Sequence, residues 1–440
     1  MRDQRPEEIL GTTKKNSLMT AFLCLATVLS PASLLSDPPQ VRTNPLEQPR
    51  FPLGVWYEGG VGAFRHDLIP EDPELAAPLY LRNFRDIAAR GCDTAVVPNT
   101  TPPHHKPLLD AAQTAGIKLI IELGHEGGEI GTMIRRNSPN PEALDRYLRE
   151  TLVPIARHPA LLRVQLLDEP WPELFDAYGT VARQVRSSVP GVEPFCCVIE
   201  SANIEAFLKK SGSDVAAFDC YPIGWKTPVG DRAALERLRR VATEAAAVCS
   251  RNGVEAWAVL QCHSITNVHR FPTPAEVRCM THLALAAGCR GIFWFLYQTE
   301  WWNRDKGEIM AGLVDEEYRE RPIWREIGLL TREIRRIEPV LRRLCPIEAP
   351  SGAESDGSVH WLRDEGGGLH AYVVNMDVTR VRLVRTSIPV PSGSGALVVA
   401  RKHSASGGAS VRRRASASGQ AEWTVSLPPG GGALFHLSFK

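Results

Sequence analysis

The sequence predicts an α/β fold: a (β/α)8 TIM barrel followed by a C-terminal antiparallel β-sandwich. Between about residues 50 and 340, short apolar segments alternate eight times with amphipathic helical segments, the strand and helix count of such a barrel. After about residue 346 the helical periodicity ends, and short alternating segments separated by Gly and Ser follow. No Gly-rich phosphate-binding loop follows the first strand, which disfavours the alternative of an open doubly wound sheet.

The barrel strands are expected where short apolar runs end in a loop. Their ranges are 51–58, 94–98, 117–122, 163–167, 194–199, 214–219, 254–260 and 290–296. Helices are expected between them, and glycines such as Gly91 and Gly116 close some of them. Their ranges are 79–89, 107–115, 141–155, 175–188, 204–210, 232–251 and 273–287.

Three regions divide the chain: a signal peptide and leader over 1–40, the barrel over 45–342, and the sandwich over 346–440. Lys14 and Lys15 precede an apolar run over 18–29 that is too short to span a bilayer comfortably, and small residues follow it. We therefore expect export to the periplasm or the medium, with no stable membrane span after signal removal. A short membrane anchor is the alternative.

Sandwich strands are expected at the alternating segments 360–362, 369–375, 381–384, 396–400, 423–427 and 433–437. The run 401–420 is rich in Ser, Gly and Arg, and this composition predicts a mobile hairpin tip. The formal net charge of +1 gives no reason to expect nucleic acid as a partner. Most cysteines lie in apolar segments, where they act as small hydrophobic residues.

The stretch 163–171 carries the strongest functional signal. An apolar strand runs directly into Asp168, Glu169, Pro170 and Trp171. Proline has no N–H to donate to a sheet, so it ends the strand. The two acids are therefore expected at the carboxyl end of this strand. In barrels of this type the chemistry lies at the carboxyl ends of the strands.

Polar and aromatic residues follow the other expected strands as well. They are Glu58, Asn99, Glu122, His125, Glu200, Asp219, Tyr221, Gln261, His263, Tyr297 and Glu300. These strand-end residues include no three histidines spaced to bind a metal ion and no lysine. Zinc-dependent hydrolysis and Schiff-base chemistry are therefore disfavoured. No metal and no organic cofactor are expected. Carboxylate chemistry remains, and glycoside hydrolysis uses two carboxylic acids across an oxocarbenium-like transition state.

The ending Leu167-Asp168-Glu169-Pro170 resembles the Asn-Glu-Pro ending of the clan of barrel glycosidases that includes β-galactosidases and cellulases, with Asp in place of Asn. The resemblance implies that Glu169 is the general acid/base. That clan places its nucleophilic Glu at the end of strand seven, where this chain has Gln261. A neutral amide cannot form a glycosyl-enzyme ester. Either another carboxylate is the second catalytic group, or the enzyme inverts through an activated water, or the site binds sugar without cleaving it. Asp219 and Glu300 are the preferred second carboxylates, ahead of Glu58, Glu122 and Glu200.

The remaining candidates are expected to bind substrate, the tryptophans by offering flat apolar faces to sugar rings. They are Trp56, Glu58, Glu122, His125, Asp168, Trp171, Tyr221, Gln261, His263, Tyr297 and Trp301. The sequence thus predicts an exported glycoside hydrolase acting on an oligo- or polysaccharide. The alternative, which Gln261 favours, is a non-catalytic carbohydrate-binding barrel, and a structural surface protein is a third possibility.

Overall fold

The computed structural model describes residues 50–57, 69–124, 128–353, 358–389, 397–405, 410–415 and 420–439. The expected signal peptide, Glu58 and His125 lie outside these residues. The chain from Phe51 to Lys440 forms one compact unit. In the part of the chain that the structure describes, no helix is both long enough and apolar enough to cross a membrane.

Nine strands form one parallel sheet in the order β5-β4-β3-β2-β1-β10-β8-β7-β6. They are β1 (Leu53–Trp56), β2 (Thr94–Val97), β3 (Lys118–Glu122), β4 (Leu161–Gln165), β5 (Pro194–Phe195), β6 (Cys197–Val198), β7 (Val215–Cys220), β8 (Glu255–Gln261) and β10 (Gly291–Phe295). The two ends of the order, β5 and β6, are consecutive and separated only by Cys196. The sheet therefore closes on itself, and the predicted barrel is confirmed.

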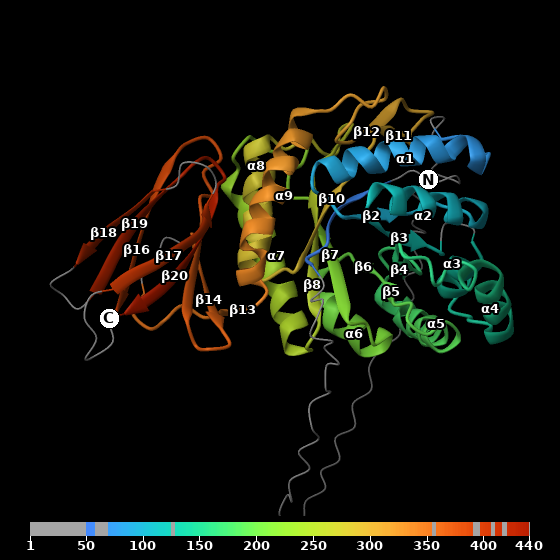
Figure 1. Ribbon diagram of the computed structural model, residues 1–440, viewed down its shortest axis with the longest axis horizontal. Helices are drawn as coiled ribbons and strands as arrows, with labels where there is room; N and C mark the ends of the chain where they lie inside the picture. The colour runs from blue at the N-terminus through green and yellow to red at the C-terminus, as the bar shows by residue number, and fades with distance from the viewer. Residues whose placement is uncertain are drawn as a thin grey trace, which may run out of the picture. The chain divides into compact units, whose positions relative to one another are not determined.

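Helices surround the barrel strands (Figure 1). They are α1 (Pro73–Ala89), α2 (Pro102–Ala115), α3 (Glu129–Arg135), α4 (Pro141–Tyr147), α5 (Phe175–Ser188), α6 (Ile204–Ser211), α7 (Arg232–Arg251), α8 (Pro274–Ala287) and α9 (Pro322–Leu341). Single turns η1 (Leu148–Leu152), η2 (Pro172–Leu174) and η3 (Ser201–Asn203) accompany them. Helices α1 and α2 begin earlier than the sequence predicts, because Pro78 and Pro107 lie inside them instead of marking a boundary.

Alternation along the strands separates two apolar layers. Trp56 lies in the barrel interior with Val96, Phe195 and Phe293, whereas its neighbour Tyr57 lies in the core between strands and helices. Residues on the inward face near a carboxyl end therefore face the mouth of the barrel. This alternation decides which of the expected site residues can reach that mouth.

A small antiparallel sheet is built from the segments that follow β8 and β10. It contains β9 (Ser264–Ile265), β11 (Glu300–Asn303) and β12 (Glu308–Ala311), in the order β11-β12-β9. Ile265 and Met310 of this sheet belong to the barrel-interior cluster. The sheet thus continues the packing of the interior beyond the carboxyl ends of β8 and β10.

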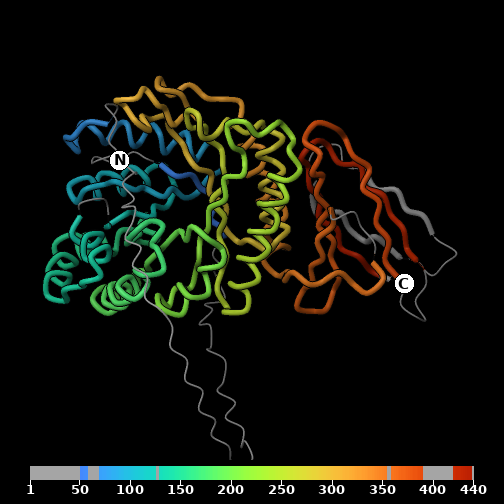
Figure 2. Tube along the Cα trace, turned by 180° about the vertical axis from the view of Figure 1, so that it is seen from behind, coloured from blue at the N-terminus to red at the C-terminus, as the bar shows by residue number. Residues whose placement is uncertain are grey.

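The C-terminal strands form two antiparallel sheets, as the sequence predicts. One has the order β13-β14-β15-β20-β17 and the other β16-β19-β18. Their bounds are β13 (Leu344–Ile347), β14 (Val359–Asp364), β15 (Leu369–Val374), β16 (Arg382–Pro389), β17 (Leu397–Ala405), β18 (Ser410–Ala415), β19 (Gln420–Leu427) and β20 (Gly432–Phe439). In Figure 2 the chain beyond α9, orange-red to red, runs back and forth in extended segments.

The sandwich core joins both sheets through Trp361 of β14 and Trp423 of β19, whose ring centroids lie 6.1 Å apart. The expectation of a hairpin tip over 401–420 is wrong for its described parts. Residues up to Ala405 belong to β17, and Ser410–Ala415 pairs with β19 along its whole length. Backbone pairing with β19 outweighs the low strand preference of the Ser- and Arg-rich composition.

Helix α8 joins the barrel to the sandwich. Nδ1 of His282 lies 2.9 Å from the hydroxyl of Tyr372 in β15, and Nη1 of Arg278 donates to the carbonyl of Pro429 at 2.7 Å. Tyr372 and Leu434 also belong to the same apolar cluster as the barrel helices. Among the described residues all nine cysteines are free, and eight of them are buried, as expected for small hydrophobic residues.

Candidate active site

Parallel strands bring their carboxyl ends to one end of the barrel, which gathers the site residues there. At this end Gly124 follows β3 and lies against the backbone after β4. A Cβ at that position would be 1.6 Å from the carbonyl oxygen of Leu166, so only glycine permits this approach. The close contact fixes the chain just before Asp168 and Glu169.

The backbone of Glu169 is held in an unusual conformation. Its φ angle is 46°, in the left-handed region that non-glycine residues seldom adopt, and its N–H donates to the carbonyl of Cys197 in β6 at 3.2 Å. Asp168 accepts a hydrogen bond of 2.9 Å from Nε2 of the buried Gln165 through Oδ1. A strained backbone persists when its surroundings determine it, and such positions cluster at functional sites.

The phenol of Tyr221 interacts with three carboxylates of the site. Burial raises the pKa of Tyr221 well above its usual value, and the negative charges of Asp219, Glu169 and Asp168 raise it further. Burial and the same three carboxylates also raise the pKa of the Cys197 thiol in the barrel interior. The strand pairing agrees with this: β6, which accepts from the Glu169 N–H through the carbonyl of Cys197, pairs Cys197 with Ala217 of β7, two residues before Asp219.

The ring of Tyr221 is fixed by aromatic contacts. Its centroid lies 4.8 Å from that of His263 at 88° and 5.5 Å from that of Phe295 in a stacked arrangement. Asp219 lies in β7, which ends at Cys220, and Tyr221 follows directly, so continued alternation places Asp219 and Tyr221 on one face. The phenol and the Asp219 carboxylate therefore enter the barrel mouth together.

His263 and His269 form a pair that the sequence did not reveal. Nδ1 of His263 lies 3.0 Å from the carbonyl of Phe295, and its Nε2 lies 3.1 Å from Nδ1 of His269. A carbonyl only accepts, so Nδ1 of His263 carries the proton and Nε2 accepts from His269. His269 has no recognisable motif spacing, and only the return of its loop toward β8 brings it to this place.

We expect the free energy of unfolding to fall as the pH is lowered from 6.5 toward 3, in part because of His263. Burial, and next the neighbouring His269, lowers the pKa of His263 from 6.5 to about 3. Over this range the unfolded chain binds a proton that folded His263 does not, so its contribution is complete above pH 6.5 and is lost below.

Chemical denaturation at a series of pH values, with wild type and His263→Gln, measures this effect. Gln can still donate to the Phe295 carbonyl, so the variant should keep the local contact and show a shallower loss of stability in acid. His282, whose pKa burial also lowers to about 3, supplies a remaining slope in both proteins. An equal slope in wild type and variant would contradict the assignment to His263.

Gln261 is bound on both sides of its amide by the backbone. Its Oε1 accepts from the Ile223 N–H and its Nε2 donates to the Ile223 carbonyl, both at 2.9 Å. Its Nε2 also lies 3.4 Å from the carbonyl of Arg270. The buried amide thus joins the loop after β7 to the loop after β8, instead of presenting itself to a ligand.

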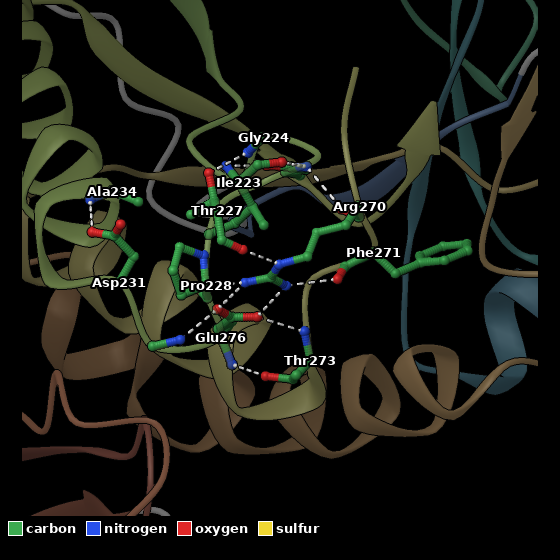
Figure 3. A network of polar contacts seen from close by, with 12 residues as sticks. Ile223, Gly224, Thr227, Pro228, Asp231, Ala234, Arg270, Phe271, Thr273 and Glu276 are labelled. Carbon is green, nitrogen blue, oxygen red and sulfur yellow. Dashed lines mark hydrogen bonds and ion pairs between the residues drawn. The ribbon is translucent and has the colours of Figure 1, made fainter. Parts of the chain in front are cut away.

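Arg270 and Glu276 strengthen the same junction (Figure 3). The guanidinium donates to both carboxylate oxygens of Glu276 at 2.7 and 2.9 Å, and to the carbonyls of Thr227 and Pro228 at 2.6 and 2.9 Å. Glu276 also accepts from the backbone of Gly230 and Thr273. We call Gln261, Arg270 and Glu276 the loop clamp, because together they fix the segments that carry Tyr221 and His269.

The remaining acids occupy distinct places. Glu122 is buried at the end of β3, and its Oε2 accepts from the N–H of Asn99 at 2.7 Å, which fixes the turn after β2. Glu200 is exposed and precedes η3. Glu300 is buried and begins β11, directly opposite Met310 of β12. Asp219 lies on β7, which pairs with β6, the strand whose Cys197 carbonyl accepts from the Glu169 N–H.

The tryptophans divide into buried and exposed ones. Trp56 packs inside the barrel, with ring centroids 6.4 Å from Phe195 and 6.0 Å from Phe295, so its faces are covered. Trp171, which follows Glu169, is 59 % exposed, and Trp301 in β11 is 43 % exposed. These exposed indole faces, which follow β4 and β10 along the chain, are available to a flat apolar ligand surface.

Tyr297 does not face the barrel mouth. It is buried in the core between strands and helices, and its hydroxyl donates to Oδ2 of Asp86 in α1 at 3.0 Å. The indole of Trp324 in α9 donates to the same oxygen at 2.8 Å. Its neighbour Leu296 packs in the barrel interior instead. Tyr297 therefore binds helices α1 and α9 together on the outer side of the barrel, away from the acids.

No protein-family model matches the sequence, and a search of curated proteins finds no match. Several solved glycoside hydrolases have similar structures. A GH2 β-galacturonidase from Eisenbergiella tayi has 16% identity and a TM-score of 0.45, over 64% of this chain and 51% of that one. A β-glucuronidase from Faecalibacterium prausnitzii has 14% identity and a TM-score of 0.48, over 65% and 49%.

A GH5 subfamily 18 protein from Streptomyces cattleya, solved with GlcNAc, has 16% identity and a TM-score of 0.47, over 68% of this chain and 83% of that one. The chain thus spans about half the length of the two larger neighbours. At such identities and TM-scores the likeness transfers no activity and no residue role. The barrel assignment rests on the strand pairing itself.

Proposed function

We propose that this chain is an exported glycoside hydrolase that cleaves glycosidic bonds of an oligo- or polysaccharide. The feature that supports the proposal is the position of its acids: Asp168 and Glu169 lie just beyond β4, the Glu169 N–H binds β6, and Asp219 lies near the carboxyl end of β7, which pairs with β6. Two carboxyl groups at one site are what this reaction requires. No organic cofactor takes part in the proposed reaction.

Glu169 is the general acid in this proposal. It protonates the leaving glycosidic oxygen. Its backbone, held in the left-handed region and bonded to Cys197, helps to fix the direction from which the proton is delivered. Asp219 is the second carboxylate and acts either as nucleophile or as the base on water, with Glu300 as the other candidate. Tyr221 donates to a substrate oxygen, and the exposed faces of Trp171 and Trp301 support sugar rings.

A non-catalytic carbohydrate-binding barrel is the second candidate function, and Gln261 favours it. At the strand end where the resembling glycosidases carry their nucleophile, this amide is occupied by the Ile223 backbone. Such a protein would keep the exposed tryptophans and the acids as a polar binding surface without completing the reaction.

Hydrolysis of a panel of aryl glycosides and natural polysaccharides by the purified full chain tests the proposal. Glu169→Gln, prepared in parallel, excludes a contaminating glycosidase. We expect release of sugar by the wild type that the variant lacks. Binding of the same polysaccharides by both proteins with no hydrolysis by either would overturn the enzyme and support the binder. Neither hydrolysis nor binding would overturn both.

A further inference from the structure

Three potential metal ligands meet on neighbouring strands of the C-terminal sandwich, apart from the barrel mouth. They are Asp364 at the end of β14, His370 in β15 and His436 in β20. His370 and His436 are register partners, and their ring centroids lie 4.8 Å apart with the planes tilted by 38°. One possible ligand atom from each of the three residues lies within 4.8 Å of the other two.

The strand alternation directs all three side chains to the same face. Ala371 and Phe435 belong to the sandwich core, so His370 and His436, one residue away on each strand, face the opposite side. Asp364 lies on that side too, because Trp361 of the same strand faces the sandwich core. The three groups therefore converge on one side of the sheet.

The carboxylate of Asp364 is already oriented. Its Oδ1 accepts from the N–H of Gly368 at 2.7 Å across the β14–β15 turn, and its Oδ2 lies 3.2 Å from Nε2 of His370. Two tetrahedral ligands at the usual zinc distances of 2.0–2.1 Å lie about 3.3 Å apart, so this separation already fits a metal between the two atoms. A ligand atom of His436 lies within 4.8 Å of both, so its ring must move closer to supply the third ligand.

The site is open to solvent on the side of Asp364. The side chain of His370 is 5% exposed, and that of Asp364 is 32% exposed. An ion can thus enter from solvent, and water can complete its coordination.

We propose that Asp364, His370 and His436 bind a first-row transition-metal ion of the Zn2+ class, which ties together β14, β15 and β20. Two imidazoles and one carboxylate form a donor set that suits such ions better than calcium or magnesium. The sequence does not reveal the site, because its residues come from three strands and lack local metal spacing. The proposal is independent of the reaction at the barrel mouth.

Isothermal titration of the chelator-treated full chain with ZnCl2 tests the site. We expect binding to wild type that is weakened at least about tenfold in His436→Gln and in Asp364→Asn, since even residues around a metal's ligands change affinity by that factor. His360→Gln is the matched control, a histidine of β14 outside the trio, and it should bind as wild type does. The thermal midpoint should rise with zinc in wild type and control only.

Circular dichroism of each variant without metal checks that it is folded. Zinc-edge X-ray absorption of the loaded wild-type chain needs no variant, and we expect nitrogen and oxygen ligands with an imidazole signature. Sulfur ligands there would overturn the proposal, because they would place the ion on cysteines. Equal zinc affinity in wild type, His436→Gln and Asp364→Asn would overturn it as well, and so would absence of binding.

Discussion

Replacing Glu169 by Gln should lower the turnover of glycosides with poor leaving groups by about 10²–10⁴-fold, the usual contribution of a general acid. Gln keeps the size and shape of the side chain but cannot transfer a proton to the leaving oxygen. Aryl glycosides with very acidic phenols need little protonation, so their hydrolysis should fall far less. The measurement is kcat/KM for a series of aryl glycosides graded by leaving-group pKa, in wild type and variant.

Glu173→Gln is the matched control, since Glu173 lies four residues further along the same loop and is exposed in η2. It should leave the whole series unchanged. A uniform loss across all leaving groups in Glu169→Gln would contradict the acid role and point to positioning or binding instead. The steeper dependence on leaving-group pKa is therefore the decisive outcome, more than the size of the loss.

The barrel could be predicted from the sequence because its signal is local. Each strand is a short apolar run, each helix has an apolar stripe, and their alternation leaves few architectures. Strand ends were less predictable. The fourth strand was expected to run to Leu167, whereas β4 ends at Gln165, so Asp168 and Glu169 lie on a short segment beyond the ladder. The left-handed backbone of Glu169 has no signature in the sequence.

Contacts between distant loops account for most differences at the site. The sequence predicts that Gln261 binds a substrate hydroxyl. Its side-chain oxygen and nitrogen instead bond to the backbone of Ile223, 38 residues away in the sequence. Position at a strand end also does not reveal which way a side chain faces. Trp56 enters the packed interior and Tyr297 faces the helices, although both follow the expected pattern of strand-end aromatics.

Breaking the ion pair between Arg270 and Glu276 in the loop clamp should strongly lower the stability of the fold. Arg270→Met is expected to lower the free energy of unfolding by about 3–5 kcal/mol, because it leaves the carboxylate of Glu276 buried without its partner cation. The side chain of Glu276 is 0% exposed and that of Arg270 is 18% exposed, so solvent offers little compensation. Urea denaturation of wild type and variant at pH 7 measures the difference.

The exposed pair Arg240–Glu244, with side chains 63% and 48% exposed, supplies the control. Arg240→Met should change stability by less than about 1 kcal/mol, as is usual for surface ion pairs. The double variant Arg270→Met/Glu276→Leu should be more stable than Arg270→Met alone, since removing both charges leaves none buried. A loss in the double variant equal to the sum of the single losses would show that the two residues act independently.

The acid limb of the stability curve provides a separate test of the clamp. Burial alone would raise the pKa of Glu276, but the hydrogen bonds from Arg270, Gly230 and Thr273 outweigh it and lower that pKa below 4.5. Its contribution is therefore present above pH 4.5 and is lost as the pH falls through the folded value, so Glu276→Gln should show a shallower acid limb. Because the clamp fixes the loops that carry Tyr221 and His269, the same variant should also weaken substrate binding at pH 7, where the carboxylate is charged in the wild type.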